Sequence, residues 1–211
     1  LLALFFINLS FGQQNEKDNF IKCNAFVSPN ASEKTISGTI AYEFKVKKAI
    51  DTIKIDAKNM EFSEVAINGK SVKFKNSGKT LNLFEGFKKG KNKLTFRYSA
   101  KPKQTLYFTG DFSNGTGQIW TQGQGRYTSH WLPSFDDVNE KVIFNISVEF
   151  DFDIFGENSI ISNGNLDYFE IYPPLSAFPD VWSFQMQKPM SSYLVMLAIG
   201  NFEKQTATTK S

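Results

Sequence analysis

Alternation of apolar and polar residues with a period of two dominates the chain. In "TISGTIAYEFKVKK", from Thr35 to Lys48, most even positions are apolar and most odd positions are polar. The segment "VIFNISVEFDFDIF", residues 142–155, alternates more strictly, with valine, phenylalanine or isoleucine at every even position. This pattern predicts long strands that bury one face in a core and expose the other face to water.

Shorter apolar runs separated by turn residues predict additional strands. Asn68-Gly69 fits a tight hairpin turn, because both central residues of a type I′ turn need positive φ. Residues 86–92, "GFKKGKN", predict a second turn, and no segment keeps helical spacing over three turns. We therefore expect a mainly β domain, an antiparallel saddle-like sheet or β-sandwich with few or no long helices. The shorter predicted strands are Thr52–Ala57, Glu64–Ile67, Val72–Lys75, Leu81–Phe84 and Leu94–Tyr98.

Residues 101–133 break the alternation and are rich in glycine and aromatic residues, which predicts loops interrupted by short strands. Loops held by a rigid sheet often carry binding residues. Within "TQGQG", Gln122 and Gln124 would share a face in an extended segment. Their amide oxygens could accept hydrogen bonds from an ammonium group, and Gly123 allows close approach of a backbone or ligand. The residues alone favour the alternative, which is a polar strand edge with glycine bulges.

The chain's one histidine and one cysteine do not form a usual zinc ligand set. His130 could act as the base of a catalytic triad, but Ser129 and Ser134 are not in a nucleophile elbow of the form G-x-S-x-G. We therefore favour a structural role for His130. Cys23 has no partner for an internal disulfide and is predicted to be a buried structural thiol.

Two groups of carboxylates are further candidates for a chemical role. Asp136 and Asp137 are adjacent, so they would point to opposite faces of a strand, and a role in a turn or cap is favoured. Glu149, Asp151 and Asp153 occupy the polar positions of the last predicted strand. A solvated face is favoured for them over a metal site.

The composition argues against nucleic acid as a partner. The net charge is only +3, and the lysines are scattered along the sequence. Arg97 and Arg126 are the only arginines, although arginine is the residue that reads bases and phosphates by paired hydrogen bonds. The 22 phenylalanines indicate a large aromatic core. Core packing is also favoured for Trp131 and Trp182, with contact between domains as the alternative. It is favoured as well for Tyr107, Phe108 and Trp120, which could instead line a cleft beside the loop that follows them.

The apolar start of the chain, "LLALFFINLSFG", is followed abruptly by polar residues. It is too short to span a bilayer as a helix, and small residues precede Gln13. This pattern predicts a truncated secretory signal peptide over residues 1–12, and the alternative is a buried strand or helix. A secreted protein is therefore expected, periplasmic or in the cell envelope of a bacterium, with membrane contact only through the signal peptide.

Several motifs, in the same order, resemble the N-terminal domain of the M1 family of zinc aminopeptidases. They are "TQGQ" at residues 121–124, "LPSFD" at 132–136, "ISNGNL" at 161–166 and "WSFQMQKPMSSYLVMLAIGNFE" at 182–203. Ser134 stands where the family pattern has cysteine, and Val138 where it usually has proline. The resemblance implies that residues 13–211 form one saddle-shaped β domain.

The resemblance also implies a catalytic domain in the same parent chain. The family motifs G-x-M-E-N and H-E-x-x-H do not occur in this sequence. The resemblance therefore implies that the catalytic residues and the zinc ligands lie outside this chain, that this fragment binds no cofactor itself, and that it is truncated at both ends. The alternative is a non-catalytic β-sandwich binding or interaction module of the same lineage.

The resemblance assigns a role to the two glutamines. In the family, the last position of the T-Q-x-[EQ] loop binds the free α-amino group at the peptide N-terminus, and this position is Gln124 here. Gln122 matches the adjacent family glutamine, which supports the cleft. Many members have glutamate at the last position, so glutamine keeps the hydrogen bond but loses the charge attraction. This departure leaves open a strict aminopeptidase or a bifunctional relative.

Overall fold

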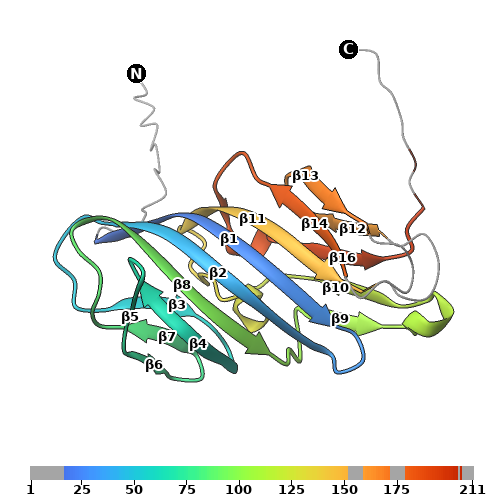
Figure 1. Cartoon of the computed structure of the whole chain (residues 1–211), viewed down its shortest axis with the longest axis horizontal. Helices are drawn as coiled ribbons and strands as arrows, with labels where there is room; N and C mark the ends of the chain where they lie inside the picture. The colour runs from blue at the N-terminus through green and yellow to red at the C-terminus, as the bar shows by residue number, and fades with distance from the viewer. Residues whose placement is uncertain (1–16, 152–158, 172–178, 204, 206–211) are drawn as a thin grey trace, which may run out of the picture.

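Three β-sheets make up the part of the chain that the structure describes (Figure 1). The structure is a computed structural model, and it describes residues 17–151, 159–171, 179–203 and 205. The large sheet has the order β13-β14-β11-β1-β2-β8-β4-β5, with β15 paired to β11, and the smaller sheets have the orders β12-β16-β10-β9 and β3-β7-β6.

The strands of the large sheet are β1 (Asp18–Asn30), β2 (Thr35–Val46), β4 (Met60–Ile67), β5 (Lys70–Ser71), β8 (Gly90–Ala100), β11 (Lys141–Phe150), β13 (Asn165–Glu170), β14 (Asp180–Gln185) and β15 (Met190–Ser191). The four-stranded sheet contains β9 (Leu106–Thr109), β10 (Gln118–Thr121), β12 (Ser159–Ser162) and β16 (Leu197–Gly200). The three-stranded sheet contains β3 (Ile53–Asp56), β6 (Phe74–Asn76) and β7 (Thr80–Leu83).

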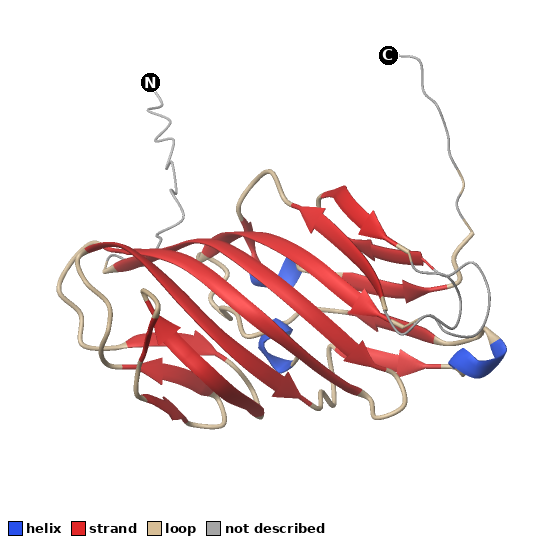
Figure 2. Cartoon of the chain, viewed as in Figure 1, coloured by secondary structure: helices blue, strands red, loops and turns tan. Residues whose placement is uncertain are grey.

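Helical structure among the described residues is limited to short 3₁₀ turns (Figure 2). They are η1 (Phe112–Asn114), η2 (Thr128–His130) and η3 (Ser192–Leu194). The prediction of a mainly β domain without long helices is confirmed. Most strand pairs are antiparallel, but β1 and β11 run parallel in the middle of the large sheet. No helix in the described part of the chain is long and apolar enough to cross a membrane.

Bulges explain two of the places where the strands differ from the predicted ranges, whereas the strand predicted over Val72–Lys75 is found without a bulge as β6, which begins only at Phe74. β1 was not predicted, because its pairing with β2 shifts between Phe20 and Lys22. Buried side chains are even-numbered before the shift and odd-numbered from Cys23 onward, so no single alternation runs through the strand. β4 starts before the predicted Glu64, whose φ is 53° in a second bulge.

The predicted turns and loops are found with small changes. Asn68 and Gly69 have φ of 53° and 78°, as a type I′ turn requires. The second turn is shorter than residues 86–92, because β8 already begins at Gly90. Residues 101–133 contain only β9, β10 and short 3₁₀ turns, as predicted. The strand predicted over residues 142–155 is found as β11, and residues 152–158, with Asp153, lie outside the described residues.

One hydrophobic cluster joins the buried side chains of all three sheets. Phe20 is its aromatic centre, with ring centroids 5.0 Å from Phe44, 5.3 Å from Tyr42 and 4.5 Å from Phe135. Cys23 is fully buried in this cluster, as predicted, and burial raises the pKa of its thiol to about 12. The thiol is therefore protonated at neutral pH and is a packing residue.

The remaining aromatic residues divide between core and surface. Trp131 is fully buried, as expected for core packing, and Phe108 packs against the core. Trp182 is partly buried against the core, with its ring centroid 5.7 Å from that of Phe169. Tyr107 and Trp120 form a half-buried pair with ring centroids 4.6 Å apart, so these two are not core residues.

Candidate functional site

The two candidate glutamines lie in the loop between β10 and η2. β10 ends at Thr121, so Gln122 and Gln124 lie beyond the strand and not along its edge. Both glutamine side chains are exposed, and Gly123 between them is buried. This alternation turns the two side chains toward solvent while the backbone between them stays packed against the domain.

The start of this loop is fixed by hydrogen bonds to two neighbouring segments. The Gln122 backbone N–H donates to the carbonyl oxygen of Thr105 at 2.8 Å. The Thr121 hydroxyl accepts from the Leu197 N–H at 2.8 Å and donates to the Leu197 carbonyl at 3.3 Å. The backbone just before Gln124 is therefore held on both sides of β10, by the segment before β9 and by β16.

The end of the loop is fixed by buried contacts with η3. The Thr128 hydroxyl donates to the Ser192 carbonyl at 2.9 Å, and this bond is buried. The Tyr127 N–H donates back to the Gly123 carbonyl at 3.5 Å. A Cβ at Gly123 would lie 2.3 Å from the Tyr193 carbonyl oxygen and 2.9 Å from the Thr128 hydroxyl, so only glycine fits there without a shift.

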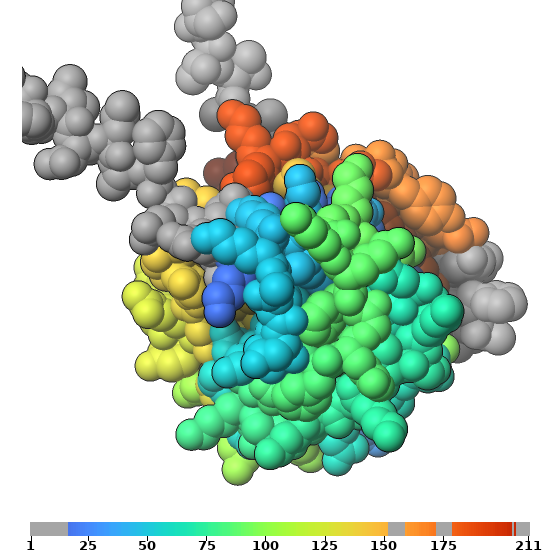
Figure 3. Space-filling model, turned by 90° about the vertical axis from the view of Figure 1, so that its left-hand side faces the viewer, coloured from blue at the N-terminus to red at the C-terminus, as the bar shows by residue number. Residues whose placement is uncertain are grey.

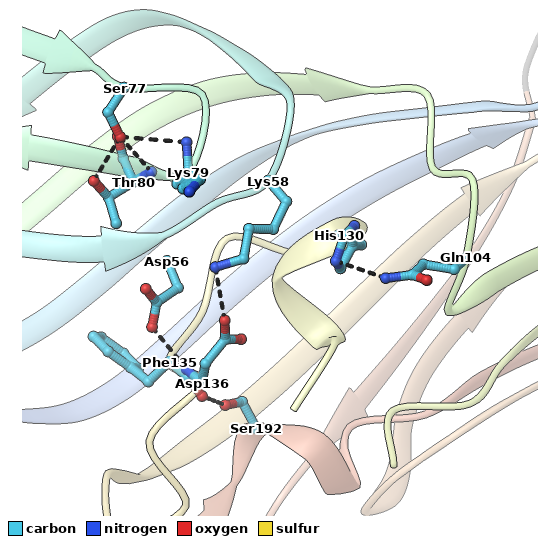
Figure 4. A network of polar contacts seen from close by, with 10 residues as sticks. All are labelled: Asp56, Lys58, Ser77, Lys79, Thr80, Gln104, His130, Phe135, Asp136 and Ser192. Atoms are coloured by element: carbon cyan, nitrogen blue, oxygen red, sulfur yellow. Dashed lines mark hydrogen bonds and ion pairs between the residues drawn. The ribbon is translucent and has the colours of Figure 1, made fainter. Parts of the chain in front are cut away.

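A polar network behind η2 connects this loop to β3 (Figure 4). The Lys58 N–H donates to the Ser129 carbonyl at 2.7 Å, and the Lys58 ammonium lies 2.9 Å from the Asp136 carboxylate. Asp56 and Ser134 exchange two backbone hydrogen bonds of 2.9 Å, and the Asp136 N–H donates to the Asp56 carboxylate at 2.8 Å. The segment that carries η2 is thus attached to β3 at several points.

Burial and the charges of this network shift the pKa of two groups, Asp56 and His130. Burial raises the pKa of Asp56, and the negative charge of Asp136 adds to the rise, while the Asp136 N–H and Lys58 oppose it. Burial lowers the pKa of His130, with a further contribution from the Lys58 charge, and Asp136 opposes it. His130 Nε2 lies 2.9 Å from Gln104 Nε2, so the neutral ring accepts a hydrogen bond there. His130 therefore has the environment of a satisfied structural histidine.

The carboxylate predictions are only partly confirmed. Asp137 accepts from the Asn139 N–H at 2.9 Å and forms the predicted turn, but Asp136 forms the ion pair with Lys58 instead. Glu149 is half-buried and accepts from the Ser28 hydroxyl at 2.5 Å, so it is not simply a solvated side chain.

Ser191 and Ser192 help to hold the segment after Trp131 in place, and no single sequence motif predicted this role. The Ser191 hydroxyl donates to the Val138 carbonyl at 2.6 Å, and the Ser192 hydroxyl donates to the Phe135 carbonyl (Figure 4). Both hydroxyls hold the segment after Trp131 against η3. The "MSSYL" part of the family pattern marks these residues, but the sequence alone does not show which carbonyls they contact.

The described residues do not fit a zinc ion. Within residues 17–151, 159–171, 179–203 and 205, no three histidine, cysteine or carboxylate side chains lie close enough together to hold a metal. Cys23 is buried in the core, and His130 is engaged with Gln104. No chemical step of this chain is therefore assigned to a metal.

The loop that carries Gln122 and Gln124 is exposed and is anchored to the β domain at both of its ends. Comparison with known families then identifies this domain: the family model described as the peptidase M1 N-terminal domain matches residues 21–194. Because this match covers most of the chain, the chain belongs to the peptidase M1 N-terminal domain family.

Relatives and solved structures agree with this family. The "Probable aminopeptidase 1" of Sulfurisphaera tokodaii is 28% identical in an alignment of 168 residues that covers 77% of this chain and 20% of that protein. The puromycin-sensitive aminopeptidase of Caenorhabditis elegans is 24% identical in an alignment of 204 residues that covers 89% of this chain and 21% of that protein. The chain thus spans about a fifth of the length of these relatives.

The fold is similar to that of solved M1 peptidases. A mutant M1 zinc metallopeptidase from Deinococcus radiodurans, bound to a Tyr-Ser-Ala substrate, superposes with a TM-score of 0.77 at 14% identity over 92% of this chain and 45% of that chain. Leukotriene A4 hydrolase from Saccharomyces cerevisiae gives a TM-score of 0.70 at 18% identity over 88% of this chain and 29% of that chain. At these identities the similarity establishes the fold.

Proposed function

We propose that this chain is the substrate-anchoring N-terminal domain of a secreted zinc aminopeptidase, and that Gln124 binds the α-ammonium group of the peptide substrate. The proposal is supported by the family, by relatives that are aminopeptidases, and by a neighbour of the same fold bound to a tripeptide. Secretion is proposed from the apolar segment at residues 1–12.

The side-chain amide of Gln124 can accept hydrogen bonds from an ammonium group, but it carries no negative charge to balance the charge of that group. The Gln124 side-chain oxygen has lone pairs that accept N–H donors from the peptide terminus. A neutral acceptor gives a weaker contact than a carboxylate, since hydrogen bonds between two charged groups are about twice as strong. In this proposal a carboxylate from the catalytic domain of the parent chain provides the remaining attraction, and Gln122 supports the cleft beside Gln124.

The proposal depends mainly on one observation, that an exposed Gln124 follows a buried and anchored backbone. The backbone that carries this side chain loses little freedom when a ligand binds, because it is already ordered. A fixed distance between the bound ammonium and the reacting carbonyl selects peptides that are cut at the first bond. Zinc, held by residues of the parent protein outside this chain, would supply the activated water. The proposal therefore expects no peptidase activity from the isolated chain.

Substitution of Gln124 in the parent enzyme tests this role. We expect Gln124→Ala to raise KM and to lower kcat/KM on an amino-acid anilide by about 1–2 kcal/mol, because one hydrogen bond to a charged group is lost. Gln124→Glu keeps an acceptor and adds a charge, so it is expected to retain or increase kcat/KM.

Gln118 provides a matched control, since it is an exposed glutamine at the start of β10. Gln118→Ala is expected to leave the kinetics unchanged. If Gln124→Ala has the same kcat/KM as the wild-type enzyme, Gln124 does not bind the substrate. A parent protein that does not hydrolyse the anilide at all would instead favour the non-catalytic interaction module.

A further inference from the structure

Lysines that are scattered along the sequence gather at one end of the large sheet. There β2 ends beside the start of β8, and the register pairs Lys45 directly with Lys91. Cross-strand partners in an antiparallel pair lie on the same face, and both side chains are exposed. The two strands are neighbours at this end of the molecule in Figures 1 and 3.

The turns at the same end carry four more lysines. Lys47 and Lys48 follow β2, and Lys88 and Lys89 precede β8. Lys89 forms a β-bridge with Val46, which brings the two turns together. All four side chains are exposed. We call residues 45–51 and 84–91 the basic end.

The basic end holds most of the charge asymmetry of the molecule. Residues 45–51 and 84–91 contain six lysines and two carboxylates, Asp51 and Glu85, so their formal charge sums to +4. Two neighbouring pairs, Lys17 with Asp18 and Lys93 with Glu43, add no net charge. Because the whole chain carries +3, the rest of the molecule is slightly acidic. An anionic surface would therefore attract this end and orient the domain.

The composition of the basic end suits a diffuse anionic surface. It contains no arginine, so it lacks the planar group that reads phosphates and bases by paired hydrogen bonds. Clusters of four to eight basic residues, roughly, are typical of contacts with anionic lipid headgroups. Phe84, in the turn that also carries Lys88 and Lys89, is 51% exposed and could enter the interface between headgroups and acyl chains.

The first described residues of the chain also lie at the basic end. The apolar residues 1–12 end five positions before Lys17, and the Lys17 carbonyl accepts hydrogen bonds from the N–H groups of Lys47 and Lys48 at 2.8 and 3.2 Å. The chain therefore enters the folded domain at the basic end.

We propose that the basic end is a docking surface for anionic phospholipid membranes, with the lysines at the headgroups and Phe84 at the interface. This contact goes beyond the proposed peptidase role, and it adds a second membrane contact to the one expected from the signal peptide. Its binding energy is electrostatic, so it weakens as salt is added.

Vesicle co-sedimentation with the 211-residue chain tests the proposal. The two vesicle types are phosphatidylcholine alone and phosphatidylcholine mixed with phosphatidylglycerol. The test variant combines Lys47→Gln, Lys48→Gln, Lys88→Gln and Lys89→Gln. We expect the partition coefficient on the anionic vesicles to fall at least about tenfold, since contributions of single lysines near an anionic surface add up.

The control variant removes the same charge elsewhere: Lys34→Gln, Lys79→Gln, Lys101→Gln and Lys103→Gln. These lysines are exposed and lie outside the basic end, so binding to anionic vesicles is expected to stay within about twofold of the wild type. All three proteins carry the same residues 1–12, so a difference between them reports only on the lysines. Both variants are expected to keep the wild-type melting temperature.

Three results would overturn the proposal. The first is an equal loss of binding in the two variants, and the second is binding that neither salt nor phosphatidylglycerol changes. The third is binding to duplex DNA that is tighter than binding to anionic vesicles and is lost in the test variant, because this would assign the basic end to a nucleic acid. Peptidase kinetics in solution do not involve these lysines and test the proposed function separately.

Discussion

Replacing Gly123 by alanine would displace the candidate loop by a distance that the structure defines. The added Cβ would lie 2.3 Å from the Tyr193 carbonyl oxygen, whereas ordinary contact begins near 3.4 Å, so the backbone must move by about 1 Å. Such a shift weakens the Gln122 N–H bond to Thr105 and the Thr128 bond to Ser192, which are 2.8 and 2.9 Å long. We expect a loss of about 2–3 kcal/mol in the free energy of unfolding, as for overpacking at other buried sites.

Two assays measure the consequences of this substitution. Urea unfolding of the 211-residue chain gives the loss of stability, and hydrolysis of an amino-acid anilide by the parent enzyme gives the effect on kcat/KM. A displacement of about 1 Å at a substrate-positioning group can lower the rate by about 100-fold, so we expect kcat/KM of Gly123→Ala to fall by about 10- to 100-fold.

Gly69→Ala separates loop displacement from a general loss of stability. Gly69 has φ of 78°, and no heavy atom lies within 4 Å of the position that a Cβ would occupy, so alanine there costs about 1–2 kcal/mol of backbone strain without a clash. It is expected to lower stability and to leave kcat/KM unchanged. If Gly123→Ala has wild-type stability and kinetics, the loop is not held as tightly as these contacts indicate, and the reasoning is refuted.

Two further predictions concern the contacts around η2. Thr128→Val keeps the buried shape but leaves the Ser192 carbonyl without its donor, so urea unfolding should show a loss of about 1–3 kcal/mol in the free energy of unfolding. The control Thr109→Val changes an exposed threonine and should cost less than about 0.5 kcal/mol. Equal losses in the two variants would contradict this prediction. His130 has a pKa lowered from 6.5, so its contribution to stability is complete above pH 6.5 and is lost as the pH falls through 6.5 toward the folded-state pKa. His130→Gln is expected to remove this part of the slope when unfolding free energies are compared between about pH 5 and 8, and an unchanged slope would show that the pKa of His130 is not lowered.

Alternation predicted the strands that lack bulges, and bulges account for several of the differences. β2 was predicted to within two residues at its end, because one alternation runs from Thr35 to Val46. β1 is at least as long as β2 and also alternates buried and exposed residues, but its bulge near Lys22 hides the pattern. The parallel pairing of β1 with β11 joins residues about 120 positions apart, and such a pairing leaves no local signal in the sequence.

The candidate glutamines could be predicted from the sequence, but the contacts that anchor their loop could not. Residue type and spacing, together with the resemblance, indicated Gln122 and Gln124. The contacts of Thr128 and Ser192 depend on η3, more than sixty residues away, which only the fold brings to the loop. The roles of the two glutamines in substrate binding remain predictions.

A crystal structure of the parent enzyme with a bound peptide would show whether Gln124 contacts the α-ammonium group of the substrate. The quantity to measure is the distance from the Gln124 side-chain oxygen to the α-nitrogen of the peptide. We predict a hydrogen bond of about 2.7–3.2 Å, with Gln122 beside it in the same cleft. A peptide whose α-nitrogen is bound only by other residues, with Gln124 turned to solvent, would contradict the account.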